Sequence, residues 1–177
     1  MNKRTHMNKQ NLAGTDLKSL MDMLANKDGT TREKARKLLV ALGKPAVPSL
    51  IWVLQNSKLD HLRWEAAKTL GSIDDTRAIP SLVKALEDKD HDVGWLAAVA
   101  LRKFKKAAWP QLLNALIKSK PDSVLLRQGA HHILQGQKED GFNKLLTTLS
   151  KSLEPSAAPE STAISAFNVL KQLKEKS

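Results

Sequence analysis

Apolar residues recur along the chain at intervals of three and four, the spacing that places them on one face of an α-helix. The segment Arg-Trp-Glu-Ala-Ala-Lys-Thr-Leu-Gly-Ser-Ile over residues 63–73 shows this pattern clearly. Val, Ile and Thr form no alternating runs that would predict strands. We therefore expect ten helices, over residues 15–26, 31–42, 46–56, 60–73, 76–88, 92–105, 107–119, 123–135, 139–152 and 160–175.

The helical pattern is itself repeated. Five leucines occupy matching positions, separated by 31, 31, 33 and 36 residues, and an alanine stands four residues before each of them. A large side chain at the alanine position would overpack two helices that approach closely, so we expect these alanines to be buried. The leucines are Leu39, Leu70, Leu101, Leu134 and Leu170, and the alanines are Ala35, Ala66, Ala97, Ala130 and Ala166.

A second motif lies between these segments and places a proline near the start of a helix. It reads Ala-Val-Pro-Ser-Leu-Ile over residues 46–51, Ala-Ile-Pro-Ser-Leu-Val over 78–83 and Ala-Trp-Pro-Gln-Leu-Leu over 108–113. Proline is favourable in the first turn, where the backbone N–H groups have no partner within the helix. Each repeat is therefore predicted to be a helix, a turn and a second helix.

The signatures Arg-x-x-Ala-Ala-x-x-Leu-Gly and Ala-Ile-Pro-x-Leu-x-x-x-Leu resemble those of the compact HEAT-like repeats of phycobilin-lyase type, and the resemblance covers residues 15–175. It implies an all-α fold, an armadillo-type α-α superhelix (α-solenoid) of about five two-helix repeats. We expect a flexible basic tail over residues 1–11 and a single HEAT-like repeat domain over 12–177. The expected repeats are 15–43, 45–73, 76–105, 107–136 and 139–176.

In HEAT-like solenoids the Arg-x-x-Ala-Ala helix lines the concave surface, so the resemblance implies a binding face there. Trp64 and Trp95 would then occupy the same position in adjacent repeats, side by side. Exposed tryptophan beside cations is typical of protein-binding hot spots and also suits base stacking; both rings packing into the core is the open alternative. The predicted binding residues are Trp64, Trp95, Lys37, Lys68, Lys103, His61, Leu96, Val99, Gln128 and His132.

The other two tryptophans are predicted to be structural. Trp109 stands where other repeats have Val47 or Ile79 and is predicted to lie in the core. Trp52 is expected to be a partly exposed residue of an outer helix. Helix N-caps are predicted at Asp16, Asp60 and Asp122, and Asp92 is also interpreted as a cap.

The charge of the chain favours an acidic partner. The net charge is +11, with a local basic cluster over residues 102–106, and a basic surface attracts acidic proteins or nucleic acid. The alternative is that Lys and Arg only solvate the outer helix faces. There is no cysteine, which excludes disulfides and thiolate metal sites.

The histidines and aspartates do not predict a metal or another cofactor. His131 and His132 are adjacent on a helix, so their side chains diverge by about 100°. The acidic segment over residues 88–92 resembles a calcium loop but is interpreted as a turn that caps the next helix. We therefore expect no metal and no cofactor.

We expect a non-catalytic scaffold module that binds an acidic protein or peptide, with nucleic acid as the alternative partner. HEAT-like DNA glycosylases also place tryptophan in a basic groove, but Lys68 and Val99 stand where their carboxylate would be needed. A bilin lyase is a further alternative that rests on the repeat type alone. The N-terminus does not read as a signal peptide and no segment reads as a membrane span, so we expect a cytoplasmic monomer without membrane insertion.

Overall fold

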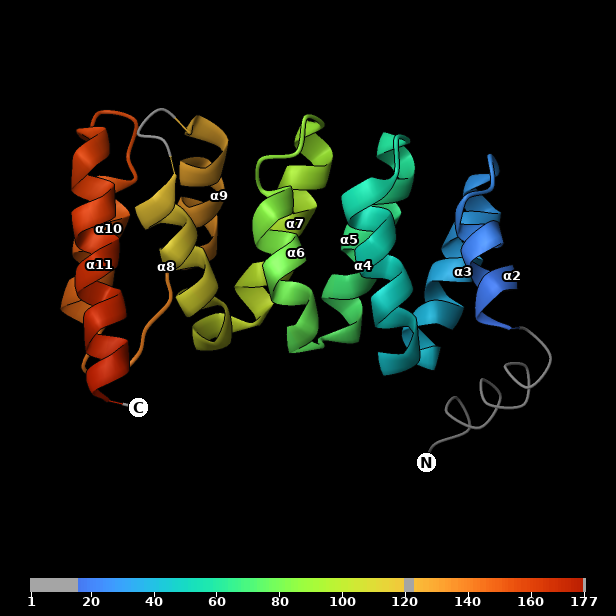
Figure 1. Cartoon of the computed structure of the whole chain (residues 1–177), viewed down its shortest axis with the longest axis horizontal. Coiled ribbons are helices and arrows are strands. Elements are labelled where there is room, and N and C mark those ends of the chain that lie inside the picture. The colour runs from blue at the N-terminus through green and yellow to red at the C-terminus, as the bar shows by residue number, and fades with distance from the viewer. Residues whose placement is uncertain (1–15, 120–122, 177) are drawn as a thin grey trace. The chain divides into compact units, whose positions relative to one another are not determined.

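The computed structural model describes residues 16–119 and 123–176, and in this part of the chain it consists of ten α-helices with short 3-10 turns and no strands (Figure 1). The predicted all-α fold of HEAT-like two-helix repeats is confirmed. The chain divides into two compact units, Met1–Ala78 and Ile79–Ser177, each described here by itself. A single domain over 12–177 stays a prediction, and the proposed tail over 1–11 lies outside the described residues.

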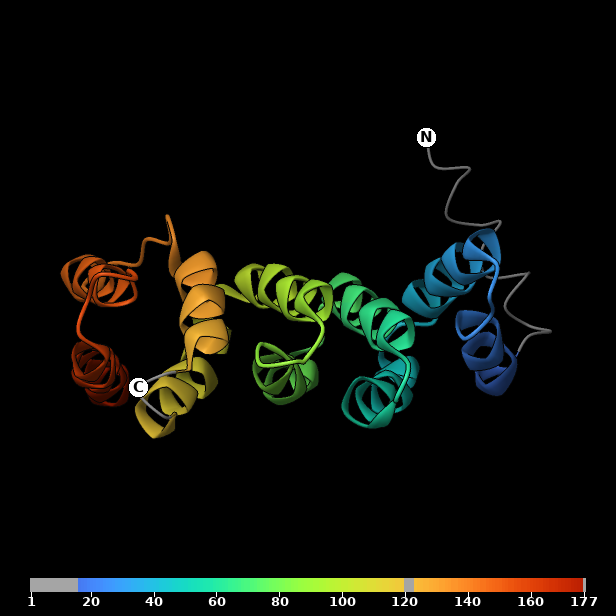
Figure 2. The same ribbon diagram turned by 90° about the horizontal axis from the view of Figure 1, so that it is seen from above.

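The first unit contains two helix pairs. Helix α2 (Leu17–Leu24) packs on α3 (Gly29–Leu42), α4 (Val47–Asn56) packs on α5 (Asp60–Ile73), and α3 lies beside α5. Seen from above, α3 and α5 form one row and α2 and α4 the other (Figure 2). The core between the rows is made of fully buried side chains that include Leu20, Leu39, Leu50, Ala66 and Leu70.

The second unit has six helices. They are α6 (Ile79–Ala85), α7 (His91–Lys103), α8 (Trp109–Lys118), α9 (Val124–Leu134), α10 (Asn143–Ser152) and α11 (Pro159–Glu175). Helix α6 packs on α7, α7 lies beside α9, and α6 lies beside α8. Helices α7 and α9 therefore lie side by side in one row, and this row carries the candidate site.

The last helix pair is placed differently from the prediction. The sequence register put α11 with α3, α5, α7 and α9, but α11 packs on α8, while α10 lies next to α9 (Figures 1 and 2). The two helices of the final repeat have thus exchanged rows. Predicting α11 as a helix of the α7–α9 row was wrong, because buried Ala166 and Leu170 indicate a packed helix face but not the row to which the helix belongs.

The regularity of the repeat is also visible in the backbone. A positive φ recurs at Gly43, Asp74, Lys105 and Gly136, which follow one another at a constant interval along the chain. Each of these residues follows the second helix of a repeat, where the chain turns sharply, and glycine is the residue that adopts this conformation without strain. Asp74 and Lys105 adopt a positive φ although they carry side chains.

The small residues and two tryptophans lie as the sequence predicts. All five repeat alanines are fully buried, Trp109 is only 1% exposed, and Trp52 is 64% exposed. The helix ends agree with the prediction to within four residues. No single helix in the described residues is long and apolar enough to span a membrane; the pair Gly29–Leu42 and Lys44–Asn56 meets the criteria of length and composition only together, across a bend of 114°.

Two of the predicted helix caps were wrong. Asp16 does cap α2, accepting the Ser19 N–H at 2.7 Å, and Asp122 lies outside the described residues. Asp60 belongs to the first turn of α5, whose N-cap is Leu59. The cap of α7 is Asp90, which accepts the N–H groups of Asp92 and Val93, so Asp92 lies too far along the chain to be the cap.

Candidate interaction face on α7 and α9

The predicted binding residues of the first unit pair with near neighbours in the chain. Trp64 is partly buried, and the Lys68 ammonium lies 4.4 Å from its ring centroid. Lys37 is exposed and pairs with Glu33 on its own helix at 2.6 Å. His61 is exposed, with Nδ1 3.8 Å from Asp60. Because Trp64 and Trp95 belong to different units, their side-by-side placement stays a prediction.

In the second unit, Trp95 of α7 and His132 of α9 contact each other. Their ring centroids are 4.3 Å apart at an interplanar angle of 45°, and Trp95 is still 55% exposed. Gln128 lies exposed one turn before His132 on α9, while Leu96 and Val99 are partly buried. The structure thus places three of the predicted residues, Trp95, Gln128 and His132, on one face, which we call the α7–α9 face.

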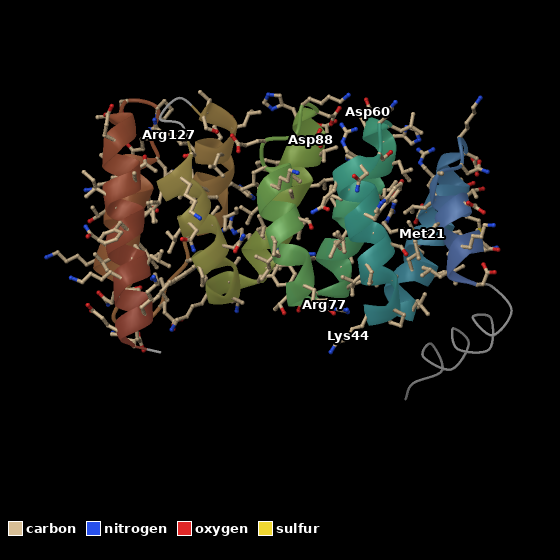
Figure 3. All side chains as sticks on the ribbon, viewed as in Figure 1. Met21, Lys44, Asp60, Arg77, Asp88 and Arg127 are labelled. Carbon is tan, nitrogen blue, oxygen red and sulfur yellow. The ribbon has the colours of Figure 1, made fainter. Side chains whose placement is uncertain are left out.

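A mainly apolar hollow of about 260 Å³ opens at one end of the α7–α9 face. Trp95 and Asp88 are among the residues that line it. Asp88 belongs to the α6–α7 loop (Figure 3). Asp88 Oδ1 accepts the backbone N–H of Asp90 at 2.9 Å, which orients the side chain. The remaining lining residues are Leu86, His91, Gly94, Ala98, Leu125, Gln128 and Gly129.

Two glycines allow the end of α6 to come close to the α7–α9 face. A Cβ atom on Gly94 would lie 3.2 Å from the carbonyl oxygen of Leu86, and a Cβ on Gly129 would lie 2.9 Å from Leu86 Cδ2. Leu86 therefore packs closely against α7 and α9 at two positions that carry no side chain. The same two positions leave room for the hollow.

A second, polar hollow of about 320 Å³ lies at the other end of the face, where α7 and α9 end. Arg102, Lys105, Lys106 and Lys138 line it together with one carboxylate, Glu139, which pairs with Lys106 at 2.7 Å. Its floor is held by Gln137, whose side chain accepts the Trp109 indole N–H at 2.8 Å and donates to the Ile133 carbonyl at 2.7 Å. The other lining residues are Gln135 and Gly136.

The polar hollow carries an excess of positive charge. Among the described residues, Arg102, Lys105 and Lys138 pair with no carboxylate; Arg102 donates only a long bond of 3.4 Å to the His132 carbonyl. Lys105 adopts the left-handed conformation with φ of 49°, which is strained for a residue with a side chain. This turn keeps Lys105 and Lys106 beside the hollow.

His132 contacts residues of both ends of the face: its ring lies against Trp95, and its carbonyl accepts from Arg102. Burial lowers the pKa of His132 below its ordinary value, and the positive charges of Arg102 and His131 act in the same direction. The imidazole is therefore mainly neutral near pH 7 and contacts Trp95 as an uncharged ring, tilted by 45°. The face can offer partners an aromatic surface between an apolar hollow and a cationic one.

Two polar clusters that the sequence analysis did not identify hold the first unit together. Glu65, only 3% exposed, accepts hydrogen bonds from Arg32 Nε at 3.2 Å and Arg36 Nη1 at 2.6 Å, linking α5 to α3. Asp75 pairs with Arg77 at 2.8 Å, and Arg77 also donates to the Lys44 carbonyl at 3.0 Å, joining two turns (Figure 3). The Arg77 guanidinium lowers the pKa of Asp75 to about 2.

The face has residues that the sequence analysis left out. Gly94, Gly129 and Asp88 shape the apolar hollow, and Arg102, Lys105, Lys106 and Lys138 shape the polar one. The basic run over 102–106 was a usable signal, but Lys138 follows a separate helix and only the fold brings it close. Within residues 16–119 and 123–176, no three His, Asp or Glu side chains are grouped to hold a metal ion.

Comparison with known proteins agrees with this architecture. The sequence profile of HEAT repeats matches residues 47–133, which includes α7 and all but the last residue of α9. Neither the curated proteins nor the solved structures gave a match. The helix pairs, the constant interval between the left-handed turns and the profile match together show that the chain is a HEAT-like repeat protein.

Proposed function

We propose that this protein is a non-catalytic interaction module that binds an acidic segment of a protein partner on the α7–α9 face. HEAT repeats in general mediate protein interactions. The observation that carries the proposal is the exposed Trp95–His132 pair, which lies on the same face as the cationic hollow. Tryptophan at a partly desolvated position is among the residues that contribute most to protein binding.

The charges of the polar hollow favour an acidic segment. Arg102, Lys105 and Lys138 already lie together without paired carboxylates in the described residues, so an incoming carboxylate displaces no internal ion pair. The net charge of +11 adds long-range attraction for acidic partners. Arginine, furthermore, can bind a carboxylate through two parallel hydrogen bonds.

The spacing along α7 limits the size of the segment. Trp95 and Arg102 are seven residues apart on one helix, which corresponds to roughly 10 Å at 1.5 Å per residue. An extended peptide rises about 3.3 Å per residue. The peptide residue that contacts Trp95 and the acidic peptide residue whose carboxylate enters the polar hollow would therefore be about three residues apart. A short linear motif therefore fits the face.

A binding measurement tests the proposal. The probe is a fluorescein-labelled peptide, Leu-Ser-Ser-Asp-Glu-Asp, measured by anisotropy at physiological salt against wild type, Trp95→Ala and Lys105→Glu/Lys138→Glu. Loss of a hot-spot tryptophan costs about 2 kcal/mol or more, so we expect at least about 30-fold weaker binding for Trp95→Ala. Trp52→Ala is the matched control, because Trp52 is similarly exposed, at 64% against 55% for Trp95, but lies on α4 of the other unit. Equal affinity of Trp95→Ala and Trp52→Ala refutes the proposed site.

Nucleic acid is the second candidate, because an aromatic ring beside free cations also suits stacked bases and phosphates. The two partners differ in their response to salt. Binding of random duplex or single-stranded DNA weakens log-linearly with salt concentration, with a slope close to the number of phosphates contacted. A steep slope together with tighter binding to DNA than to the acidic peptide would replace the first proposal by this one.

A further inference from the structure

One position in the second helix of the repeats carries an arginine that binds backbone carbonyls. Arg32 of α3 donates to the carbonyls of Asn26 and Lys27 at 3.0 and 2.8 Å, and Arg63 of α5 donates to the Ser57 carbonyl at 3.0 Å. In both helices the guanidinium lies over the turn that leads into its own helix. The arginine side chain therefore satisfies backbone carbonyls of this turn through hydrogen bonds within the same chain.

The matching residue of α7 is Gly94, which follows Arg63 at the same interval at which Arg63 follows Arg32. Asp88, six residues before Gly94, takes the place of Asn26 and Ser57, which stand six residues before their arginines. The apolar hollow of about 260 Å³ lies at this place, and both Gly94 and Asp88 line it. The hollow is thus found where the other two repeats have a guanidinium.

Arg127 of α9 also donates to backbone carbonyls, although these lie at the end of α10 and in the α10–α11 loop and not in the turn that leads into its own helix. Its guanidinium donates to the carbonyls of Ser152, Glu154 and Ala157, at distances between 3.0 and 3.3 Å (Figure 3). Carbonyl-rich turns at the ends of these helices are therefore suited to a planar donor with five N–H groups.

We propose that the hollow at Gly94 binds the side chain of an arginine supplied by the partner, in place of the arginine that the third repeat lacks. This inference rests on the proposed function, since the arginine belongs to the same bound segment. The partner segment would then carry an arginine that binds at one end of the α7–α9 face and acidic residues that bind at the other end.

The lining of the hollow matches the chemistry of arginine. Asp88, which lines the hollow, supplies a charged acceptor for the guanidinium, and the exposed Trp95 ring offers a cation–π contact. The apolar walls formed by Leu86, Ala98 and Leu125 suit the methylene groups of the side chain. His91 also lines the hollow, and Lys89 is exposed on the same loop.

The geometry also gives the spacing of the partner's charges. Gly94 and Arg102 are eight residues apart on α7, or roughly 12 Å. That length corresponds to about four residues of extended chain. The partner motif is therefore an arginine separated by about four residues from a cluster of Asp or Glu.

The test compares two peptides that differ in one charge. The first is Arg-Ala-Ala-Ser-Asp-Glu-Asp, synthesised also in the reverse order, and the second has citrulline, which is neutral and has nearly the same shape, in place of arginine. We expect wild type to bind the arginine peptide in one of the two orders at least tenfold more tightly than its citrulline analogue. Equal affinity for arginine and citrulline in both orders overturns the inference.

Three variants separate the hollow from the rest of the face. Gly94→Arg supplies the guanidinium from within, so the preference for arginine should vanish while the citrulline peptide still binds. Gly94→Ala is the matched control, because it brings the same Cβ close to the Leu86 carbonyl as Gly94→Arg does but adds no guanidinium, and it should keep the preference. Asp88→Asn, which preserves shape, should reduce the preference several-fold. Circular dichroism checks that each variant is folded. If both Gly94→Arg and Asp88→Asn keep the wild-type preference for the arginine peptide over the citrulline peptide, the inference is contradicted.

Failure of this inference can be told apart from failure of the proposed function. If the citrulline peptide binds and loses affinity in Lys105→Glu/Lys138→Glu, the acidic subsite stands and only the arginine hollow is rejected. If neither peptide binds the wild type, the proposed function is rejected with it. The readouts depend on different residues, at opposite ends of α7.

Discussion

Glu65 offers a strong test of how the first two repeats are held together. It lies 3% exposed between two arginines of α3, with Arg32 and Arg36 side chains that are themselves only 24% and 17% exposed. Glu65→Ala leaves both guanidiniums without this acceptor in a mostly buried place. Breaking a buried pair costs about 3–5 kcal/mol, and because both arginines reach some water we expect roughly 2–4 kcal/mol here. At about 2–4 °C per kcal/mol for a chain of this size, the melting temperature should fall by about 5–15 °C.

The assay is thermal unfolding followed by circular dichroism at 222 nm, with urea titration as a second measure. Glu33→Ala is the matched control, because Glu33 also pairs with a cation, but Glu33 and Lys37 are 51% and 73% exposed. An exposed pair of this kind contributes at most about 1 kcal/mol. If Glu65→Ala destabilises the protein no more than Glu33→Ala does, then the α3–α5 cluster does not stabilise the fold as argued.

Three further predictions concern stability. Lys105→Gly should stabilise the protein by roughly 0.5–1 kcal/mol, since the strain of a left-handed lysine exceeds the entropy that glycine loses on folding; a lower melting temperature would contradict the backbone geometry. The Asp75 carboxyl, with its pKa lowered from 3.8 to about 2, contributes stability that is present above pH 4 and lost as the pH falls to 2. The melting temperatures of wild type and Asp75→Asn should therefore converge over this range, and a constant difference would refute the assignment. Ala66→Leu should lower the melting temperature through overpacking by about 1–3 kcal/mol, because Ala66 is fully buried; unchanged melting would contradict the repeat register.

Most of the fold follows from local patterns that the chain carries in every repeat. The alanine and leucine register placed Ala66 and Leu70 in the core, and position within the repeat distinguished buried Trp109 from exposed Trp52. The exchange of rows by α10 and α11 could not be predicted in this way. An amphipathic helix shows which face is buried, whereas the row it joins depends on the path of the preceding loop and on contacts with α8.

The site was predictable only in part. Trp95, Gln128 and His132 share a face because steps of four along α9 and matching positions of neighbouring helices can be read from the sequence. Glu65 was missed because a glutamate in a helix reads as a solvated residue until its arginines on α3 are seen beside it. Gly94 departs from the repeat pattern in the sequence itself, but only the structure shows that a hollow accompanies the missing arginine.

The most direct measurement of the central claim is a nitrogen-15 spectrum of the four tryptophan indoles during titration with the acidic peptide Leu-Ser-Ser-Asp-Glu-Asp. Single Trp→Phe variants assign the four signals. We expect the Trp95 indole signal to shift with saturating behaviour, while that of Trp52, which is similarly exposed on α4, does not shift. A peptide that binds while shifting Trp52 and leaving Trp95 unmoved would contradict the assignment of the α7–α9 face as the interaction site.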